Sequence, residues 1–225
     1  MSAPAGAELA YETIREAIVE GRYPPGCRLV EARVAEELEL SRTPVREAIR
    51  RLDAEGLVVT QRNRGAVVRE LTVEDVRDLY ELRIRLESYA AELAATRITP
   101  TELVGLHEEV DRFSALVPRV DGTVGSLRAL GDANRAIHDR IVEASHHQRL
   151  GAMLRRAVDI PLVFRAFRSF ERPELERSDL FHRLIASAID SRDGRRASRL
   201  MAEHIAQGLD GVLTSMRGRN DPTDD

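Results

Sequence analysis

Histidine and asparagine side chains in the C-terminal half of this sequence could bind a metal ion. Six histidines are present, and His138 stands four residues after Asn134, so the two share one face of a helix. His182 and His204 fall in two later stretches of helical periodicity. Imidazole nitrogens gathered from three helices would suit Zn, Ni or a similar divalent ion and leave positions open for a ligand. The spacing also permits a second interpretation, in which these histidines are core or surface residues without a metal.

Hydroxyl and guanidinium groups near the N-terminus are suited to DNA. Arg42 and Arg46 are four residues apart and emerge on one helix face, where either could donate two hydrogen bonds to a guanine. The hydroxyls of Ser41 and Thr43, together with the amides at a helix N-terminus, suit phosphate. The alternative is that the arginines form a solvated helix face.

The elements that must position the N-terminal group are three short helices and a hairpin. Helical periodicity predicts helices at 8–20, 30–38 and from Ser41 to about 55, and two β-rich runs at 57–60 and 66–68 flank a polar turn. This order is the plan of a winged helix-turn-helix, in which the second helix of the motif enters the major groove. Arg62, Asn63 and Arg64 at the hairpin tip could then reach the minor groove or the DNA backbone.

The histidines lie in a region with helical periodicity throughout. Six helices are expected, at 72–97, 99–117, 124–145, 147–169, 174–191 and 195–216. Short connections favour a bundle of largely antiparallel neighbours. The predicted fold is therefore mostly α, with a winged helix-turn-helix domain at 8–70, an all-helical domain at 72–217 and a disordered tail at 218–225.

Composition narrows the class of protein. Of the 225 residues, 43% are hydrophobic and 32% charged, which is typical of a soluble globular chain. One cysteine, the absence of a signal-peptide pattern and the lack of a long apolar stretch favour a cytoplasmic protein without a membrane span. The net charge of −4 argues against a protein that coats nucleic acid, whereas residues 41–70 hold seven arginines and four acids. A local basic patch of this kind favours a specific DNA reader.

Residues 8–70 resemble the DNA-binding domain of the GntR family. The run SRTPVREAIRRLDAEGLV at 41–58 is the most specific part, and the preceding GR-x-PPG-x-RL-x-E pattern also matches. The resemblance implies that Arg33, Arg42, Arg46 and the wing from Arg62 to Gly65 contact DNA. One departure is the segment ELEL at 37–40, since the family usually has glycine at the position of Glu39.

The helical part resembles the FCD ligand-binding domain of the FadR subgroup, at 79–95, 132–145 and 181–205. Many such domains bind a divalent metal, and the resemblance implies the ligands Asn134, His138, His182 and His204. Asparagine stands where aspartate is the commoner ligand, which removes one negative charge. The family also often has Gly-Asn where His146 and His147 stand.

The resemblance further implies a small organic or sugar acid as effector. With neutral histidines and a divalent ion the site would be near +2, and Arg83 is the candidate to add to this charge. An intrahelical pair between Arg83 and Glu87 is the alternative for that arginine.

The sequence thus predicts a transcriptional regulator, a repressor released by a carboxylate, that acts as a homodimer on a short inverted repeat in double-stranded DNA. Two alternatives remain open at this point. One is a metal-dependent enzyme that uses the three histidines, although no carboxylate is evidently placed as a general base. The other is a constitutive DNA-binding protein without an effector.

Overall fold

The computed structural model describes residues 3–61, 65–70, 72–157 and 170–220. By its internal contacts the chain divides into two units, Met1–Thr72 and Val73–Asp225.

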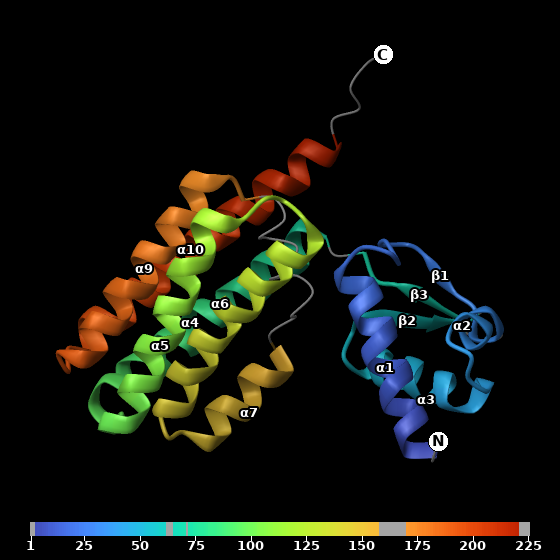
Figure 1. The fold of residues 1–225 in the computed structure, drawn as a ribbon, viewed down its shortest axis with the longest axis horizontal. Coiled ribbons are helices and arrows are strands. Elements are labelled where there is room, and N and C mark those ends of the chain that lie inside the picture. Colours follow the sequence, from blue (N-terminus) through green and yellow to red (C-terminus); the bar gives the residue numbers. More distant parts are fainter. Residues whose placement is uncertain (1–2, 62–64, 71, 158–169, 221–225) are drawn as a thin grey trace. The chain divides into compact units, whose positions relative to one another are not determined.

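The first unit consists of three helices and a small antiparallel sheet (Figure 1). Its elements are α1 (Ala3–Val19), β1 (Arg28–Leu29), α2 (Glu31–Glu37), α3 (Arg42–Ala54), β2 (Val58–Gln61) and β3 (Gly65–Val68). The strand order is β1-β3-β2, with Arg28 and Val59 both opposite Val67. The predicted winged helix-turn-helix is confirmed, and β1 is an addition, since a strand of two residues is too short to show a period.

The core of this unit explains why α3 is held firmly. Val45, Ala48, Ile49 and Leu52 form the apolar stripe of α3, and all four are buried. They join a cluster that includes residues of α1 and the sheet. Because this stripe faces inward, the arginines of α3 are left on the opposite, solvent-facing side.

Two helix ends in this unit use a left-handed residue. After α3, Gly56 has φ 76°, and the amide of Leu57 donates to the carbonyl of Leu52 at 2.9 Å. After α2, Glu39 has φ 55°, and the amide of Leu40 donates to the carbonyl of Ala35 at 2.9 Å. Both ends are Schellman motifs. Glycine adopts this conformation freely, whereas glutamate adopts it at a cost.

The second unit is a helical bundle, and among its described residues each of the six predicted helices is present at least in part (Figure 1). Its elements are α4 (Val73–Arg97), α5 (Pro100–Leu116), a 3₁₀ turn η1 (Val117–Arg119), α6 (Val124–Ala144), α7 (Gln148–Ala157), α9 (Arg172–Asp190) and α10 (Gly194–Asn220). Helix α10 packs along α4 and α9, and α5 packs against α6 and α9. Thr99 caps α5 in a capping box with Glu102.

Three predicted boundaries need comment. The helix expected at 147–169 is described only as α7, because residues 158–169 lie outside the described residues. The prediction that the tail begins at 218 is wrong, since α10 continues to Asn220. Gly218 alone costs a helix only about 1 kcal/mol, and the first proline after it is Pro222. The rest of the predicted tail, 221–225, falls outside the described residues.

Candidate functional site

Helix α3 presents a row of arginines on its exposed face. Arg42, Arg46 and Arg50 follow one another at intervals of four residues, and all three are exposed. Ser41 occupies the N-cap position, but its side chain makes no capping hydrogen bond, and Thr43 is exposed beside it. These groups have the types and the placement that reading a major groove requires.

One carboxylate from α2 pairs with this row. Glu31 accepts from Nε of Arg46 at 3.1 Å through each of its oxygens, and its Oε2 also accepts from Nη2 at 2.9 Å. Arg42 is at the edge of the same pairing, with Nη2 4.0 Å from Oε2 of Glu31. The hydrogen bond from Arg46 is the main cause that lowers the pKa of the Glu31 carboxyl, and it raises the pKa of Arg46. Nothing in the sequence pattern pairs Glu31 with Arg46, since fifteen residues separate them.

The remaining residues predicted to contact DNA are partly described. Arg33 is exposed on α2. Arg62, Asn63 and Arg64 lie outside the described residues. Gly65 has φ 79°, and a Cβ built on it would lie 2.5 Å from the carbonyl oxygen of Leu29. Glycine is therefore required at position 65 for the approach of β3 to β1, whatever contact its backbone makes with DNA.

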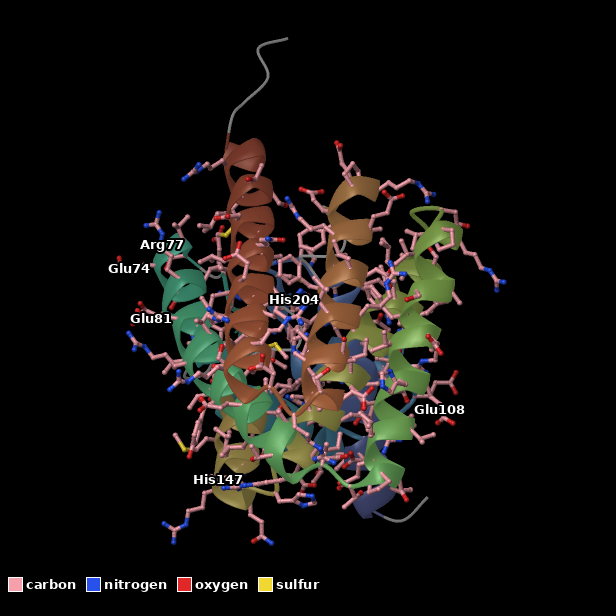
Figure 2. The ribbon with its side chains drawn as sticks, turned by 90° about the vertical axis from the view of Figure 1, so that its left-hand side faces the viewer. Glu74, Arg77, Glu81, Glu108, His147 and His204 are labelled. Atoms are coloured by element: carbon pink, nitrogen blue, oxygen red, sulfur yellow. The ribbon has the colours of Figure 1, made fainter. Side chains whose placement is uncertain are left out.

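In the helical unit the structure brings together three of the predicted metal ligands. His138 comes from α6, His182 from α9 and His204 from α10, and each offers a nitrogen within 4.8 Å of the others. Nε2 of His204 lies 3.2 Å from Nε2 of His138 and 3.1 Å from Nε2 of His182. Figure 2 shows His204 directed into the bundle, whereas Glu74 and Glu81 on α4 point outward.

The distances between these nitrogens test whether the cluster fits one ion. Two nitrogens that bind the same ion at about 2.1 Å lie about 3.0 to 3.4 Å apart, between the octahedral and tetrahedral angles. The separations of 3.1 and 3.2 Å fall in this range. Burial lowers the pKa of both His182 and His204 well below the usual value, and the imidazoles beside them lower it further. Neutral imidazole is the form that binds a metal, so the cluster fits a divalent ion.

A buried ion pair on α4 supports one member of the cluster. Oε2 of Glu87 lies 2.5 Å from Nδ1 of His138, and Oε1 of Glu87 accepts from Nε of Arg83 at 2.8 Å. Burial alone would raise the pKa of Glu87, but Arg83 and then His138 outweigh it and bring that pKa to about 2. A carboxylate on the second nitrogen of a ligating histidine fixes its tautomer and increases its basicity. His182 has no such support, because its Nδ1 is buried without a hydrogen-bond partner among the described residues.

The ion pair with Glu87 accounts for only part of the role of Arg83. The intrahelical pair that the sequence allowed is present, so the positive charge of Arg83 is balanced by a carboxylate. Arg83 also lines the pocket beside the cluster. Sequence reasoning named Glu87 only as a partner of Arg83 and missed its contact with His138, because 51 residues separate the two.

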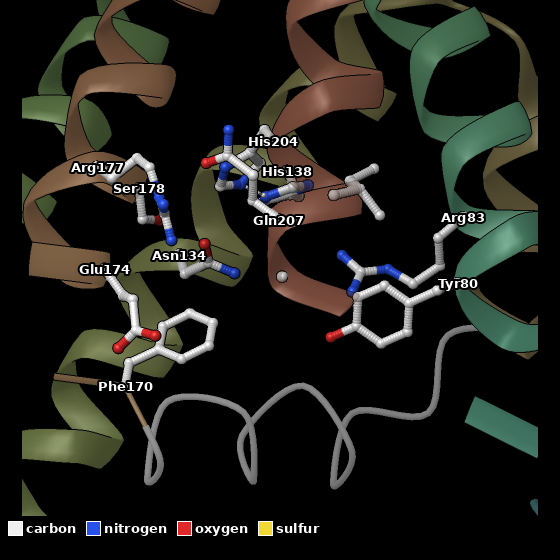
Figure 3. A pocket seen from close by; sticks show the side chains of 12 residues that line it. Tyr80, Arg83, Asn134, His138, Phe170, Glu174, Arg177, Ser178, His204 and Gln207 are labelled. Atoms are coloured by element: carbon white, nitrogen blue, oxygen red, sulfur yellow. Dashed lines mark hydrogen bonds between the residues drawn. The ribbon is translucent and has the colours of Figure 1, made fainter. Parts of the chain in front are cut away.

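A pocket opens next to the histidine cluster (Figure 3). It holds about 490 Å³ of space, its open mouth included. Asn134, the fourth predicted ligand, lines it together with His138 and His204, and it is buried one turn before His138 on α6. The other side chains around it come from α4, α10 and the region of α9: Tyr80, Arg83, Phe170, Glu174, Arg177, Ser178, Ile205 and Gln207.

Phe170 is in the pocket because α10 carries a glycine opposite it. A Cβ built on Gly211 would lie 2.2 Å from Cε1 of Phe170, whereas one built on Gly208 would meet Cε1 of Tyr80 at 3.4 Å. The sequence analysis did not identify Phe170 or Arg177 as pocket residues. Neither matches a motif, and only the packing of α9 against α10 brings them to this place.

None of the described helices is long and apolar enough to cross a membrane. A winged helix-turn-helix joined to a helical unit with a pocket defines the class of transcriptional regulators that bind DNA with one unit and carry a second unit for other tasks. The chain belongs to the GntR family of bacterial regulatory proteins, whose model matches residues 7–68, and it carries an FCD domain at 78–207. It is a regulator and not an enzyme, so the alternative of a metal-dependent enzyme is wrong.

Relatives from other bacteria agree with this assignment. The chain is 30% identical over 203 residues to the Nta operon transcriptional regulator of Aminobacter aminovorans, which covers 89% of this chain and 91% of that protein. It is also 30% identical over 204 residues to the "probable D-xylose utilization operon transcriptional repressor" of Paenarthrobacter nicotinovorans. That alignment covers 89% of this chain and 86% of that protein. The match to YdhC of Bacillus subtilis, 29% identical, spans 67% of this chain and 65% of that protein.

Solved structures show the same fold. McbR/YncC of E. coli superimposes with a TM-score of 0.78 at 22% identity, over 96% of this chain and 99% of that one. A GntR regulator from Rhodococcus sp. RHA1 gives 0.72 at 24% identity, over 93% and 98%.

Proposed function

We propose that this protein is a repressor whose operator binding is released when a small carboxylate binds beside a divalent metal in the helical unit. The observation that carries the proposal is the histidine cluster, two members of which, His138 and His204, line a pocket shared with Arg83. One relative bears the name of an operon repressor, which supports the sign of regulation.

The proposed metal ligands are His138, His182 and His204, with the amide oxygen of Asn134 as a weaker fourth. Imidazole suits Zn and Ni, and a bound ion would supply the positive charge that attracts a carboxylate. Three neutral histidines and one amide leave the charge of a divalent ion uncancelled. Since Glu87 already balances Arg83, the ion and not Arg83 would dominate the attraction.

On the DNA side we assign base contacts to Arg42 and Arg46 and phosphate contacts to Ser41 and Thr43. Arg33 and the wing residues Arg62–Gly65 are assigned to DNA by family resemblance. Loss of one bidentate base contact costs about 5- to 150-fold in discrimination, and a dimer loses it twice. Arg42→Ala or Arg46→Ala should therefore abolish specific binding, whereas Arg85→Ala, an exposed arginine of α4, should not.

We also propose a homodimer on a short inverted repeat. A single recognition helix covers only a short half-site, so one copy would give little specificity. Sedimentation at micromolar concentration should give about twice the chain mass of 25.2 kDa. A monomer that still binds its operator would contradict this.

Metal analysis and DNA binding together test the effector site. His204→Ala should remove the metal and the response to carboxylates while operator binding survives. His107→Ala is the matched control, because His107 is an exposed histidine of α5 outside the cluster. The readouts are elemental analysis of untagged protein, melting with and without added Zn or Ni, and a gel shift with the region upstream of its own gene in the presence of malate, citrate or gluconate.

Each failure of this experiment has a distinct meaning. If the protein holds no stoichiometric metal and is not stabilised by Zn or Ni, the histidines are structural. If no acid changes operator binding, the protein is a constitutive DNA-binding protein, and the effector part of the proposal is refuted.

A further inference from the structure

Glu31 covers only one edge of the Arg46 guanidinium. Its carboxylate accepts hydrogen bonds from Nε and from one N–H group of Nη2. Within the described part of the chain Nη1 has no partner, so Nη1 and the outer hydrogen of Nη2 remain available as a pair. A guanine presents two acceptors, N7 and O6, in its major-groove edge, and two parallel N–H groups of one arginine match them.

Two physical effects follow from a carboxylate at this position. First, it holds a long side chain in one geometry before DNA arrives, which reduces the entropy that binding would otherwise cost. Second, it places a negative charge beside Arg46 and Arg42. A phosphate approaching either arginine is repelled by that charge, whereas a neutral base edge is not.

We infer that Glu31 is a specificity-determining positioning residue, which directs Arg46 to a base edge and discourages both arginines from contacting phosphate. The inference rests on the proposed assignment of Arg46 to the groove. Glu31 is expected to reduce the affinity for DNA that lacks the operator sequence and to increase the ratio between operator and other DNA.

A purely structural role for this pair makes a different prediction. Half of the Arg46 side chain and 23% of the Glu31 side chain are exposed, and exposed ion pairs contribute little to stability. If the pair served only to hold α2 against α3, removing it would lower the melting temperature and leave the sequence preference unchanged.

The test compares Glu31→Gln with Glu36→Gln in the full-length protein. Both remove one negative charge from α2, but Glu36 is exposed and makes no ion pair with the arginines of α3 in the described structure. The probes are an operator duplex selected from random DNA with the wild-type protein and a scrambled duplex of the same length, each titrated at several salt concentrations.

For Glu31→Gln we expect tighter binding to the scrambled duplex and a ratio of operator to scrambled affinity that falls at least about 5-fold, as expected when one base contact is impaired. Each additional phosphate contact should steepen the plot of log affinity against log salt by about 0.9. A new selection with this variant should show a relaxed preference at one base pair of each half-site, while the rest of the operator sequence is kept. Glu36→Gln should change both affinities equally and keep the ratio.

The outcomes separate this inference from the proposed function. An equal ratio for Glu31→Gln and Glu36→Gln overturns the role of Glu31. Operator affinity that is unchanged in Arg46→Ala overturns the groove assignment and the inference with it.

Discussion

Replacing Glu87 by glutamine tests how the helical unit tolerates charge in its core. The side chains of Arg83 and Glu87 are 7% and 5% exposed, and Nε of Arg83 lies 2.8 Å from Oε1 of Glu87. Glutamine keeps the shape and one acceptor for His138 but leaves the guanidinium buried without a counter-charge. Removing one partner of a buried pair costs about 3 to 5 kcal/mol.

The expected loss converts to a measurable shift in melting. For a domain of 150 to 250 residues, each kcal/mol lowers Tm by about 2 to 4 °C, so Glu87→Gln should lower it by roughly 6 to 20 °C. Thermal and urea denaturation followed by circular dichroism are the assays. Glu81→Gln is the matched control on the same helix, because Glu81 pairs with Arg85 at the same 2.8 Å but with 63% and 71% of the side chains exposed. Its effect should stay within about 1 kcal/mol.

A double variant then separates stability from metal binding. Arg83→Met combined with Glu87→Gln removes both charges, so most of the lost stability should return. Metal affinity should stay about 10- to 100-fold lower, because the carboxylate on His138 is still missing. If Glu87→Gln has the same melting temperature as Glu81→Gln, or if the double variant is no more stable than Glu87→Gln, the reasoning from a buried charge is refuted.

Three further changes have defined outcomes. Glu39→Gly should stabilise the first unit by about 0.5 to 1 kcal/mol in urea unfolding. Glycine adopts a positive φ without the steric cost that glutamate has, although the greater entropy of the unfolded chain with glycine offsets part of this gain; destabilisation would contradict the strain argument. Gly211→Ala should displace Phe170 and weaken the response to carboxylates without affecting operator binding. Gly125→Ala on α6, whose added Cβ would meet nothing within 4 Å, gains a similar helix propensity and should leave the response intact; equal behaviour of the two variants would rule out Phe170 as a pocket wall. Asn134→Asp should tighten binding of Zn in calorimetry and weaken the effect of a carboxylate, since it adds a negative charge beside the ion; unchanged metal affinity would remove Asn134 from the ligand set.

The fold could be predicted from the sequence because the signals that begin and end its helices involve only neighbouring residues. Gly56 ends α3, and Thr99 begins α5, each through contacts within a few residues. The histidine cluster could be predicted for a different reason, since its members stand at positions that a family resemblance identifies. Helical periodicity and short-range capping require no knowledge of the tertiary structure.

What could not be predicted depends on contacts between distant segments. The bond from Glu87 to His138 and the pairing of Glu31 with Arg46 join different helices, and no periodicity reports them. The backbone conformation after three helices was also not predicted, because glycine is absent there. Glu39, His146 and Arg192 all adopt positive φ, of 55°, 49° and 58°, although none has the residue type that usually marks such an end.

Helix α4 gives the buried pair a consequence for communication along the chain. Its first residue, Val73, directly follows the last residue of the DNA-binding unit, and the same unbroken helix carries Glu87. Fourteen residues of helix separate these two points, a rod of about 21 Å at 1.5 Å per residue. Because separating Glu87 from Arg83 or His138 would leave a charge buried without its partner, the ring of His138 on α6 is tied to α4 by a contact that is costly to break. The helix that begins where the DNA-binding unit ends is therefore also the helix that holds His138 in place.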